Sequence, residues 1–345
     1  NCGPSIHFIE FFAGSTGKII NTPVVINADN KIVLNAYNER RHFYVEANGS
    51  LTLQNITLVQ GFNNTGGGGS IYNLGTLILD GANILDSNVD VNRSGGAILT
   101  SGGPVTITDS RLENNTGGSV GGLYLVGESA DATITNSIFR NNRTTNTTYG
   151  LGGAITTWDG ADVTIRNSTL EGNQARQGGA IYNQFAATTI AIDANAKVIT
   201  NTATLTGGAI SNLLGTITIS NSTLSGNSAQ AGDGGGIYAA GGLLTISSST
   251  LFSNSVAADH SGGAISSSDG PVTITDSRLE DNSAGNAGGL YLIGESADAT
   301  VTNSIFRNNR TTAVSSTGAF GNGGAISTWN GADVTIRTST LQGNQ

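Results

Sequence analysis

The sequence contains few of the residues on which small secreted folds and helical folds depend. It has one cysteine, Cys2, no methionine and only four prolines in 345 residues. A single thiol cannot form a disulfide within the chain, so we expect Cys2 to be free or to pair with a thiol outside this sequence. Charged residues amount to 11%, and runs of Ala, Glu, Lys and Leu are missing. The chain therefore has little propensity for helix.

Further absences narrow the classes of protein. No stretch approaches 18 apolar residues, so no membrane-spanning segment is predicted in this sequence. The formal charge is −9, and no basic stripe is present to neutralise phosphates, so nucleic acid is not expected as a partner. The 50 glycines show no period of three, which excludes collagen, and an apolar content of 37% argues against disorder.

The abundant feature is a repeat built on glycine pairs. A Gly-Gly-small-aliphatic motif recurs at intervals of 26 to 35 residues. A strand pattern of period two follows each motif after about ten residues, as at 105–108, and a short Ser-x-aliphatic-x-x-Asn segment comes next. The motifs begin at Gly68, Gly95, Gly121, Gly152, Gly178, Gly207, Gly234, Gly262, Gly288 and Gly323.

Strands this short cannot form a core alone, but stacking at about 4.8 Å per rung pairs each strand with its equivalents in the neighbouring rungs. We therefore predict an all-β fold, a right-handed parallel β-helix with three short strands per rung of about 27 residues. Val105, Ile107 and Leu112 are expected to point inward. The glycine pair suits a corner at which a Cβ atom would clash.

An asparagine that recurs after the third predicted strand indicates a stacked amide ladder, which satisfies turn backbone groups between rungs. We assign this ladder a structural role, because a catalytic residue is not needed in every rung. Its predicted members are Asn88, Asn115, Asn142, Asn173, Asn201, Asn227, Asn254, Asn282, Asn309 and Asn344.

The organisation predicted from these patterns has two parts. Residues 1–67 lack the complete Gly-Gly-small-aliphatic motif and carry an aromatic cluster, and we interpret them as capping rungs before the regular rungs of residues 68–345. Within the latter, residues 95–144 match 262–311 without a gap at 40 of 50 positions. The duplication extends over 95–174 and 262–345, and it stops in mid-pattern, so we expect the natural chain to continue.

The motifs resemble those of a known family. Gly-Gly-Ala-Ile together with Phe-x-x-Asn, at Phe139 and Phe306, resembles the repeat pair of chlamydial polymorphic outer-membrane proteins. The opening Asn-Cys-Gly-Pro-Ser-Ile and residues 51–58 are similar to secreted right-handed β-helix proteins of free-living bacteria. This resemblance implies an extracellular or cell-surface location in a bacterium, and roles as adhesins, passenger domains or wall scaffolds.

We interpret the chain as an extracellular structural or adhesive scaffold, not an enzyme, that displays the same loops twice. Length varies mainly between the ladder asparagine and the next glycine pair, a corner at which binding is expected. Candidate contacts are Arg143 and Arg310, at the start of the longest loops, and Trp158 and Trp329, which could stack on a sugar ring. Cell-surface glycans are the expected ligands, and exposed strand edges make self-association into fibres physically available.

The main alternative is a polysaccharide lyase or hydrolase, because pectin-degrading enzymes share the predicted fold. Such chemistry needs clustered carboxylates, or Asp with Arg or Lys and calcium. Asp131, Asp159 and Asp162 could approach one another across rungs, although turn chemistry accounts for them more simply. A glycan-binding module is a third reading, and Arg166 and Arg337 interrupt the threonine columns that ice binding would need. We predict no catalytic residue, metal or cofactor.

Overall fold

The structure is a computed structural model that describes residues 7–10, 17–312 and 323–345. Every regular element in these residues is a β-strand, and they contain no helix. The chain divides into two compact units, unit 1 (residues 1–175) and unit 2 (residues 176–345). Cys2 and most of the long loop after Asn309 lie outside the described residues, so the predictions for them stay predictions.

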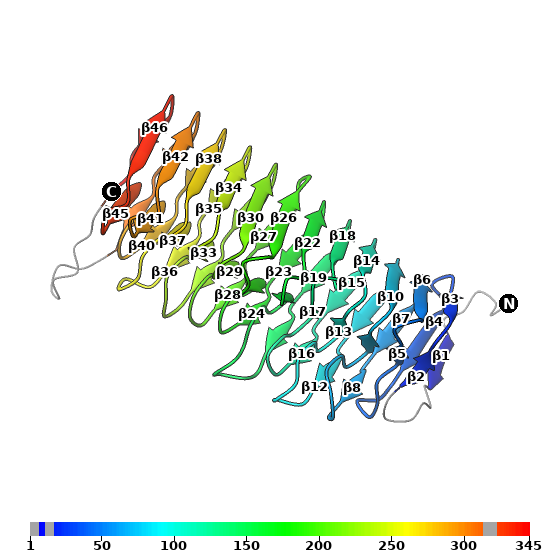
Figure 1. Ribbon diagram of the computed structural model, residues 1–345. Helices are drawn as coiled ribbons and strands as arrows, with labels where there is room; N and C mark the ends of the chain where they lie inside the picture. Colours follow the sequence, from blue (N-terminus) through cyan, green and yellow to red (C-terminus); the bar gives the residue numbers. More distant parts are fainter. Residues whose placement is uncertain (1–6, 11–16, 313–322) are drawn as a thin grey trace. The chain divides into compact units, whose positions relative to one another are not determined.

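In unit 1, successive rungs add strands to four parallel sheets, A to D (Figure 1). Sheet A contains β1 (His7–Glu10), β4 (Ile32–Asn35), β7 (Thr57–Val59), β11 (Asn83–Leu85), β15 (Arg111–Glu113), β19 (Ile138–Arg140) and β23 (Thr169–Glu171). Sheet B contains β2 (Lys18–Ile20), β5 (Phe43–Val45), β9 (Ile71–Asn73), β13 (Ile98–Ser101), β17 (Leu123–Val126) and β21 (Ile155–Trp158). Sheet C contains β3 (Pro23–Asn27), β6 (Ser50–Gln54), β10 (Thr76–Asp80), β14 (Val105–Thr108), β18 (Ala132–Thr135) and β22 (Val163–Arg166). Sheet D contains β8 (Phe62–Asn63), β12 (Asn88–Val89), β16 (Thr116–Gly117), β20 (Arg143–Thr144) and β24 (Gln174–Ala175).

Unit 2 repeats the same four strands per rung. Its sheet A strands are β27 (Lys197–Ile199), β31 (Thr223–Ser225), β35 (Thr250–Phe252), β39 (Arg278–Glu280), β43 (Ile305–Arg307) and β47 (Thr340–Gln342). Its sheet B strands are β25 (Ile181–Asn183), β29 (Ile210–Asn212), β33 (Ile237–Ala240), β37 (Ile265–Ser268), β41 (Leu290–Ile293) and β45 (Ile326–Trp329). Its sheet C strands are β26 (Thr189–Asp193), β30 (Thr216–Ser220), β34 (Leu244–Ser247), β38 (Val272–Thr275), β42 (Ala299–Thr302) and β46 (Val334–Arg337). Its sheet D strands are β28 (Thr202–Ala203), β32 (Ser228–Ala229), β36 (Ser255–Val256), β40 (Ser283–Ala284) and β44 (Arg310–Thr311).

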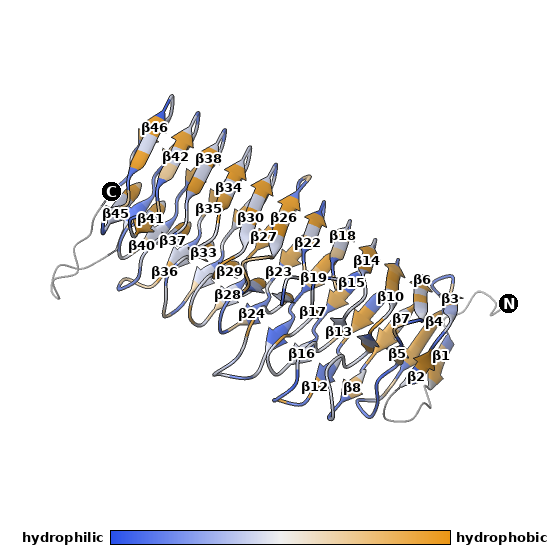
Figure 2. Ribbon diagram, in the orientation of Figure 1, coloured by the Kyte–Doolittle hydropathy of each residue, from blue (hydrophilic) through white to orange (hydrophobic). Residues whose placement is uncertain are grey.

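The interior is built from aliphatic columns in register between rungs. Val105 pairs with Ala132, and Ile107 pairs with Ile134, in parallel strands of sheet C. These residues and Leu112 are buried, as the period-two pattern predicts, and the hydrophobic positions alternate along the strands in Figure 2. Burial of each such aliphatic side chain contributes about 1.5–3 kcal/mol. The parallel β-solenoid with three main strands per rung is confirmed, and the two-residue strands of sheet D are an addition to the prediction.

Single residues with positive φ form the turns on both sides of sheet A. Asp109 (φ 49°) precedes β15 and Asn114 (φ 58°) follows it, and Asn136 and Asn141 do the same for β19. Asn and Asp tolerate this left-handed conformation because their short polar side chains bond locally. The chain can therefore bend sharply with one residue. These side chains are exposed, so they line the two edges of sheet A with polar groups.

The amide ladder is present from Asn115 onward. In unit 1, the Asn115 backbone N–H and Nδ2 both donate to Asn142 Oδ1, at 3.1 and 2.9 Å. Asn142 Nδ2 also donates to the Leu112 carbonyl at 2.9 Å. The same paired bonds join Asn142 to Asn173 in unit 1, and Asn201 to Asn227, Asn227 to Asn254, Asn254 to Asn282, Asn282 to Asn309 and Asn309 to Asn344 in unit 2.

The assignment of Asn88 to this ladder is wrong by one residue. Ser87 takes the ladder position, because its backbone N–H donates to Asn115 Oδ1 at 2.9 Å. Asn88 instead begins β12, where it pairs with Thr116, and its Nδ2 donates to Asn38 Oδ1 at 2.7 Å. The buried Ser87 hydroxyl bonds Ser70 Oγ at 2.7 Å, so a hydroxyl can replace the amide at the first position of the ladder.

A second ladder, of serines, was not predicted. The Ser110 N–H donates to Ser137 Oγ at 3.1 Å, and the Ser137 N–H donates to Ser168 Oγ at 3.0 Å. Each hydroxyl donates in turn to the carbonyl two residues earlier, as Ser137 does to Thr135 at 2.7 Å. The serine that opens each Ser-x-aliphatic segment thus satisfies turn backbone between rungs.

The glycine pairs form the tight corner that leads into sheet B. Gly95 has φ 71°, and a Cβ atom on Gly96 would lie 2.3 Å from the Gly121 carbonyl oxygen. The pair at 121–122 is displaced by one position relative to the preceding pair, because Leu123 pairs with Ile98, and the pair at 288–289 is displaced in the same way in unit 2. Gly122 is therefore level with an alanine of the preceding motif.

Two buried polar residues tie the early rungs of unit 1 together. The Arg41 guanidinium donates to the carbonyls of Gly68 and Gly67 at 2.8 and 2.6 Å and lies 5.2 Å from the Tyr72 ring centroid. His42 is fully buried; its Nε2 bonds the Leu34 carbonyl at 3.0 Å and its Nδ1 bonds the hydroxyl of Ser70 at 3.1 Å. Burial lowers the His42 pKa to about 4, so this imidazole is neutral at pH 7.

Candidate ligand-binding groove

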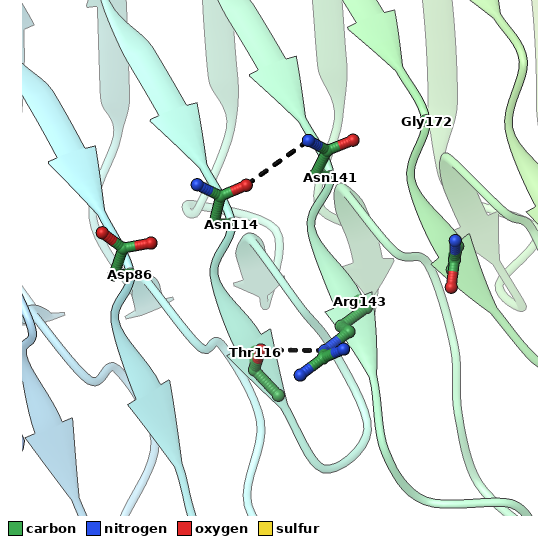
Figure 3. Close-up of a pocket in the computed structure, with 7 residues that line it drawn as sticks. Asp86, Asn114, Thr116, Asn141, Arg143 and Gly172 are labelled. Carbon is green, nitrogen blue, oxygen red and sulfur yellow. Dashed lines mark hydrogen bonds between the residues drawn. The ribbon is translucent and has the colours of Figure 1, made fainter.

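A polar groove crosses the strands of unit 1 at the corner between sheets A and D. It has a volume of about 400 Å³. Figure 3 shows Asp86, Asn114 and Asn141 in one row, and Thr116 and Arg143 below them. The residues that line it are Asp86, Asn114, Thr116, Asn141, Arg143, Gly172 and Gln174. We call this surface the unit 1 groove.

The two rows come from two repeated positions in the rung. Asp86, Asn114, Asn141 and Gly172 are the single-residue turns that follow sheet A, all with φ between 53° and 63°. The other row consists of the first residues of the sheet D strands, in which Arg143 pairs in register with Thr116 and with Gln174. A buried ladder residue, Ser87 in the first of these rungs and an asparagine in the others, lies between the rows, so its two neighbours project outward.

Few of the groove's polar groups are used within the protein. Asn141 Nδ2 donates to Asn114 Oδ1 at 3.4 Å, and Arg143 Nε donates to Thr116 Oγ1 at 3.3 Å (Figure 3). The two terminal nitrogens of Arg143 bond no other described residue. The groove therefore presents an amide nitrogen, an amide oxygen and most of a guanidinium group to solvent.

This arrangement is suited to hydrogen bonding and to the recognition of one anionic group. A guanidinium pairs with a carboxylate through two parallel hydrogen bonds. The one carboxylate in the lining, on Asp86, is two rungs from Arg143, which is about 10 Å at the ordinary strand spacing. The lining does not contain the pair of carboxylates on which glycoside hydrolysis depends.

Unit 2 has an equivalent surface made from the duplicated residues. Ser283 pairs in register with Arg310, as Thr116 does with Arg143. Asp281 and Asn308 are turn residues with positive φ, both 54°. Two positions change charge type: Asp281 occupies the position of Asn114, and Ser253 (φ 53°) occupies the position of Asp86. We call this the unit 2 surface; it consists of Ser253, Asp281, Ser283, Asn308, Arg310, Gly343 and Gln345.

A model of the right handed beta helix region matches residues 24–203 and, again, residues 154–345. The chain belongs to the right-handed β-helix family. Comparisons with curated proteins and with solved structures found no match. Because one fold supports many functions, membership in the right-handed β-helix family establishes the architecture and leaves function to be argued from the surface.

In this right-handed β-helix, the four predicted contact residues do not gather in one place. Arg143 lines the unit 1 groove, and Arg310 has the same place in the unit 2 surface. Trp158, half-buried, ends β21 and pairs with Val126, whereas Trp329, 57% exposed, ends β45 and pairs with Ile293. Both tryptophans therefore lie in sheet B, away from the corner between sheets A and D.

The turn residues of the groove were missed by sequence reasoning. Asn114 and Asn141 each precede a ladder asparagine, and only one member of such an Asn-Asn pair is needed for the ladder. The second member was the available signal, because an asparagine next to a buried one in an extended chain faces outward. Asp86 has the same position before Ser87.

The aspartates that were considered as a carboxylate site, Asp131 and Asp162, are joined by a hydrogen bond between rungs, and unit 2 has the equivalent bond. Asp131 Oδ1 accepts the backbone N–H of Asp162 at 2.8 Å, and Asp298 does the same for Asp333 at 2.9 Å. Across residues 7–10, 17–312 and 323–345, no three His, Cys, Asp or Glu side chains are grouped to hold a metal ion. The same residues include no helix long and apolar enough to cross a membrane.

Proposed function

We propose that this right-handed β-helix is an extracellular structural or adhesive protein of a bacterial cell surface, and that its groove surfaces hold glycan chains. The observation that carries the proposal is the recurrence of Asn141 and Arg143 as Asn308 and Arg310, outward-facing at the same register positions. The resemblance of the glycine-pair motifs to polymorphic outer-membrane proteins supports the location. Two copies of a weak site on one chain bind a polymer with higher avidity than either copy alone.

The chemistry of the lining supports binding more strongly than catalysis. Amides, hydroxyls and a guanidinium match the hydroxyl groups of a sugar chain. The rigidity of the backbone also favours binding, because the amide and serine ladders bond the turns of each rung to those of the next. Such a site needs no rearrangement to bind an extended polymer.

The test is retention on polysaccharides with product analysis in the same tubes. The whole chain is incubated with soluble and insoluble neutral and acidic polysaccharides, and both bound protein and released reducing ends are measured. We expect retention without release. Reducing-end release that is abolished in Asp159→Ala would instead establish the carbohydrate-active alternative. A Trp158→Ala, Trp329→Ala double variant is the matched control, and loss of its retention would move the site to sheet B.

Self-association is a separate part of the proposal with a separate test. Electron microscopy of native, undenatured protein is expected to show fibres if the protein is a self-assembling scaffold. Single particles at all concentrations would remove the fibre role and leave the adhesive one.

A further inference from the structure

We propose that the unit 1 groove binds a polysaccharide that carries carboxylate groups, with one carboxylate paired to the Arg143 guanidinium. The unit 2 surface binds the same polymer more weakly, because Asp281 stands where unit 1 has Asn114. This inference rests on the proposed function and names the class of its ligand.

Arg143 differs from the arginines beside it in having no acidic partner among the residues that the structure describes. Arg140 bonds Glu171 at 2.9 Å and approaches Glu113 at 3.7 Å. Arg111 bonds Glu113 at 2.8 Å. Arg143 is held instead by the neutral hydroxyl of Thr116, through Nε alone. Its terminal nitrogens are thereby oriented toward solvent while their charge stays uncompensated, which is the arrangement that a carboxylate ligand requires.

The neighbouring groups favour a sugar chain over an acidic peptide. Peptides add to free sheet edges or lay apolar side chains in apolar grooves. In unit 1, β16 pairs with both β12 and β20, so the groove has no free edge at this point. Its lining is made of amide, hydroxyl, carboxylate and guanidinium groups and a glycine, with no apolar side chain. Ring hydroxyls can bond the free Asn114 nitrogen and the free Asn141 oxygen.

The placement of one carboxylate distinguishes the two copies. In unit 1 the lining carboxylate, Asp86, is two rungs from Arg143, or about 10 Å, which exceeds the Debye length of about 8 Å at physiological salt. In unit 2, Asp281 precedes Arg310 by one rung, or about 5 Å along the stacking direction. Asp281 therefore lowers the positive potential at Arg310 and repels an anionic ligand. Ser253 replaces Asp86 in that unit, so the more distant carboxylate is absent there.

A neighbouring difference outside the lining also removes a negative charge in unit 2, in opposition to the effect of Asp281. Glu171, which pairs with Arg140, is Gln342 in unit 2, so the sheet A face there has one less negative charge. Comparison of the two natural surfaces therefore understates the effect of Asp281. Single exchanges at positions 114 and 281 isolate it.

The experiment is calorimetric titration of the whole chain with polygalacturonate at low and physiological salt. Dextran (neutral), dextran sulfate (anionic without carboxylate) and polyglutamate (acidic peptide) are the comparison probes. We expect binding to polygalacturonate that weakens with salt, a roughly tenfold loss in Arg143→Gln and a loss of less than about threefold in Arg310→Gln. Asn114→Asp should weaken binding several-fold, and Asp281→Asn, in the Arg143→Gln background, should restore part of it. Unchanged melting temperatures show that each variant is folded.

Five outcomes would overturn the proposal, and they differ in what else they affect. Equal affinity for dextran contradicts the recognition of a carboxylate but is consistent with the proposed function. Equal affinity for dextran sulfate shows that charge alone is read, and tighter binding of polyglutamate makes the partner an acidic protein. Unchanged affinity in Arg143→Gln places the site elsewhere. Failure of the natural chain to bind any glycan contradicts both this inference and the proposed function.

Discussion

The duplicated blocks, residues 95–144 and 262–311, differ by one kind of exchange in their interior and by another kind on their surface. Of the 50 aligned positions in 95–144 and 262–311, 40 are identical. Interior exchanges such as Ile134 to Val301 and Thr100 to Ser267 each remove one methylene or methyl group and keep the class of side chain. The exchange of buried Val120 for Ala287 is larger, because it removes two carbon atoms, but it also keeps an apolar side chain.

The surface exchanges have another character. Asn114 becomes Asp281, which introduces a charge, and Thr116 becomes Ser283, which removes only a methyl group. Both positions belong to the groove corner, where the backbone is the same in both copies. The comparison teaches that the ladders and glycine corners fix the scaffold, while ligand preference can change through the outward turn residues alone.

The largest predicted effect is loss of a ladder amide, which tests whether the two interiors are equivalent. Asn142→Ala leaves the Asn115 backbone N–H and one of the two Asn115 Nδ2 hydrogens without an acceptor, and Asn309→Ala does the same to Asn282. Each unsatisfied buried group costs about 1–3 kcal/mol, so each variant should lose roughly 3–5 kcal/mol of unfolding free energy. Urea titration followed by circular dichroism measures this loss. Asn141→Gly is the control, because Gly172 occupies the same turn position, and it should change stability by less than about 1 kcal/mol.

Markedly unequal losses in the two ladder variants would break the equivalence of the copies. The unit with the smaller loss would then have a different acceptor for the freed donors. A loss in Asn141→Gly as large as that in Asn142→Ala would show that the turn, and not the ladder, stabilises the corner.

A second prediction concerns the early rungs, in which the buried His42 makes the stability of the protein depend on pH. Its pKa is about 4 in the folded chain and 6.5 in the unfolded chain. Between these values the unfolded state binds more protons, so His42 contributes stability above pH 6.5 that is lost as pH falls to about 4. The loss should be on the order of 3 kcal/mol. His42→Gln should be less stable at pH 7 but should lack this part of the pH dependence, as measured by melting temperature from pH 7 to pH 4. Parallel profiles for the two proteins would contradict the buried neutral imidazole.

The smallest predicted effect sharpens the comparison of the sheet A faces. Glu171→Gln removes the Arg140–Glu171 pair and gives unit 1 the residue that unit 2 has at Gln342. The pair is about one-third exposed, so the loss of stability should be no more than about 0.5 kcal/mol and should vanish at high salt. Melting temperatures in low and high salt measure it. A salt-independent loss above 1 kcal/mol would show that the pair is a structural element of unit 1.

The fold was predictable because its signals are local and repeated. Glycine pairs, period-two strands and ladder asparagines recur in every regular rung, and each constrains the backbone directly. The error at Asn88 has a physical cause: the ladder accepts a hydroxyl at its first position, so the adjacent Ser87 serves equally well. The displaced pair at Gly121 has a similar cause, because register follows the buried Leu123 and not the glycines.

The groove could be predicted only in part. Arg143 and Arg310 were selected for their place at the start of long loops, but their neighbours across the rungs depend on register, which single rungs do not specify. Asn114 and Asp86 were missed because one-residue turns leave no loop in the sequence. Trp158 and Trp329 were selected as exposed aromatic residues. The sequence does not specify which sheet contains them, so it could not show that they lie away from the groove.

The most direct measurement is modification of arginines by phenylglyoxal, read by peptide mass spectrometry, with and without polygalacturonate. Both Arg143 and Arg310 are exposed, so we expect both to react in the free protein, and the exposed Arg93 and Arg337 serve as internal controls. The account predicts strong protection of Arg143, weaker protection of Arg310 and no protection of the controls. Equal modification of Arg143 in the presence and absence of a bound polymer would show that the ligand lies elsewhere and would contradict the account.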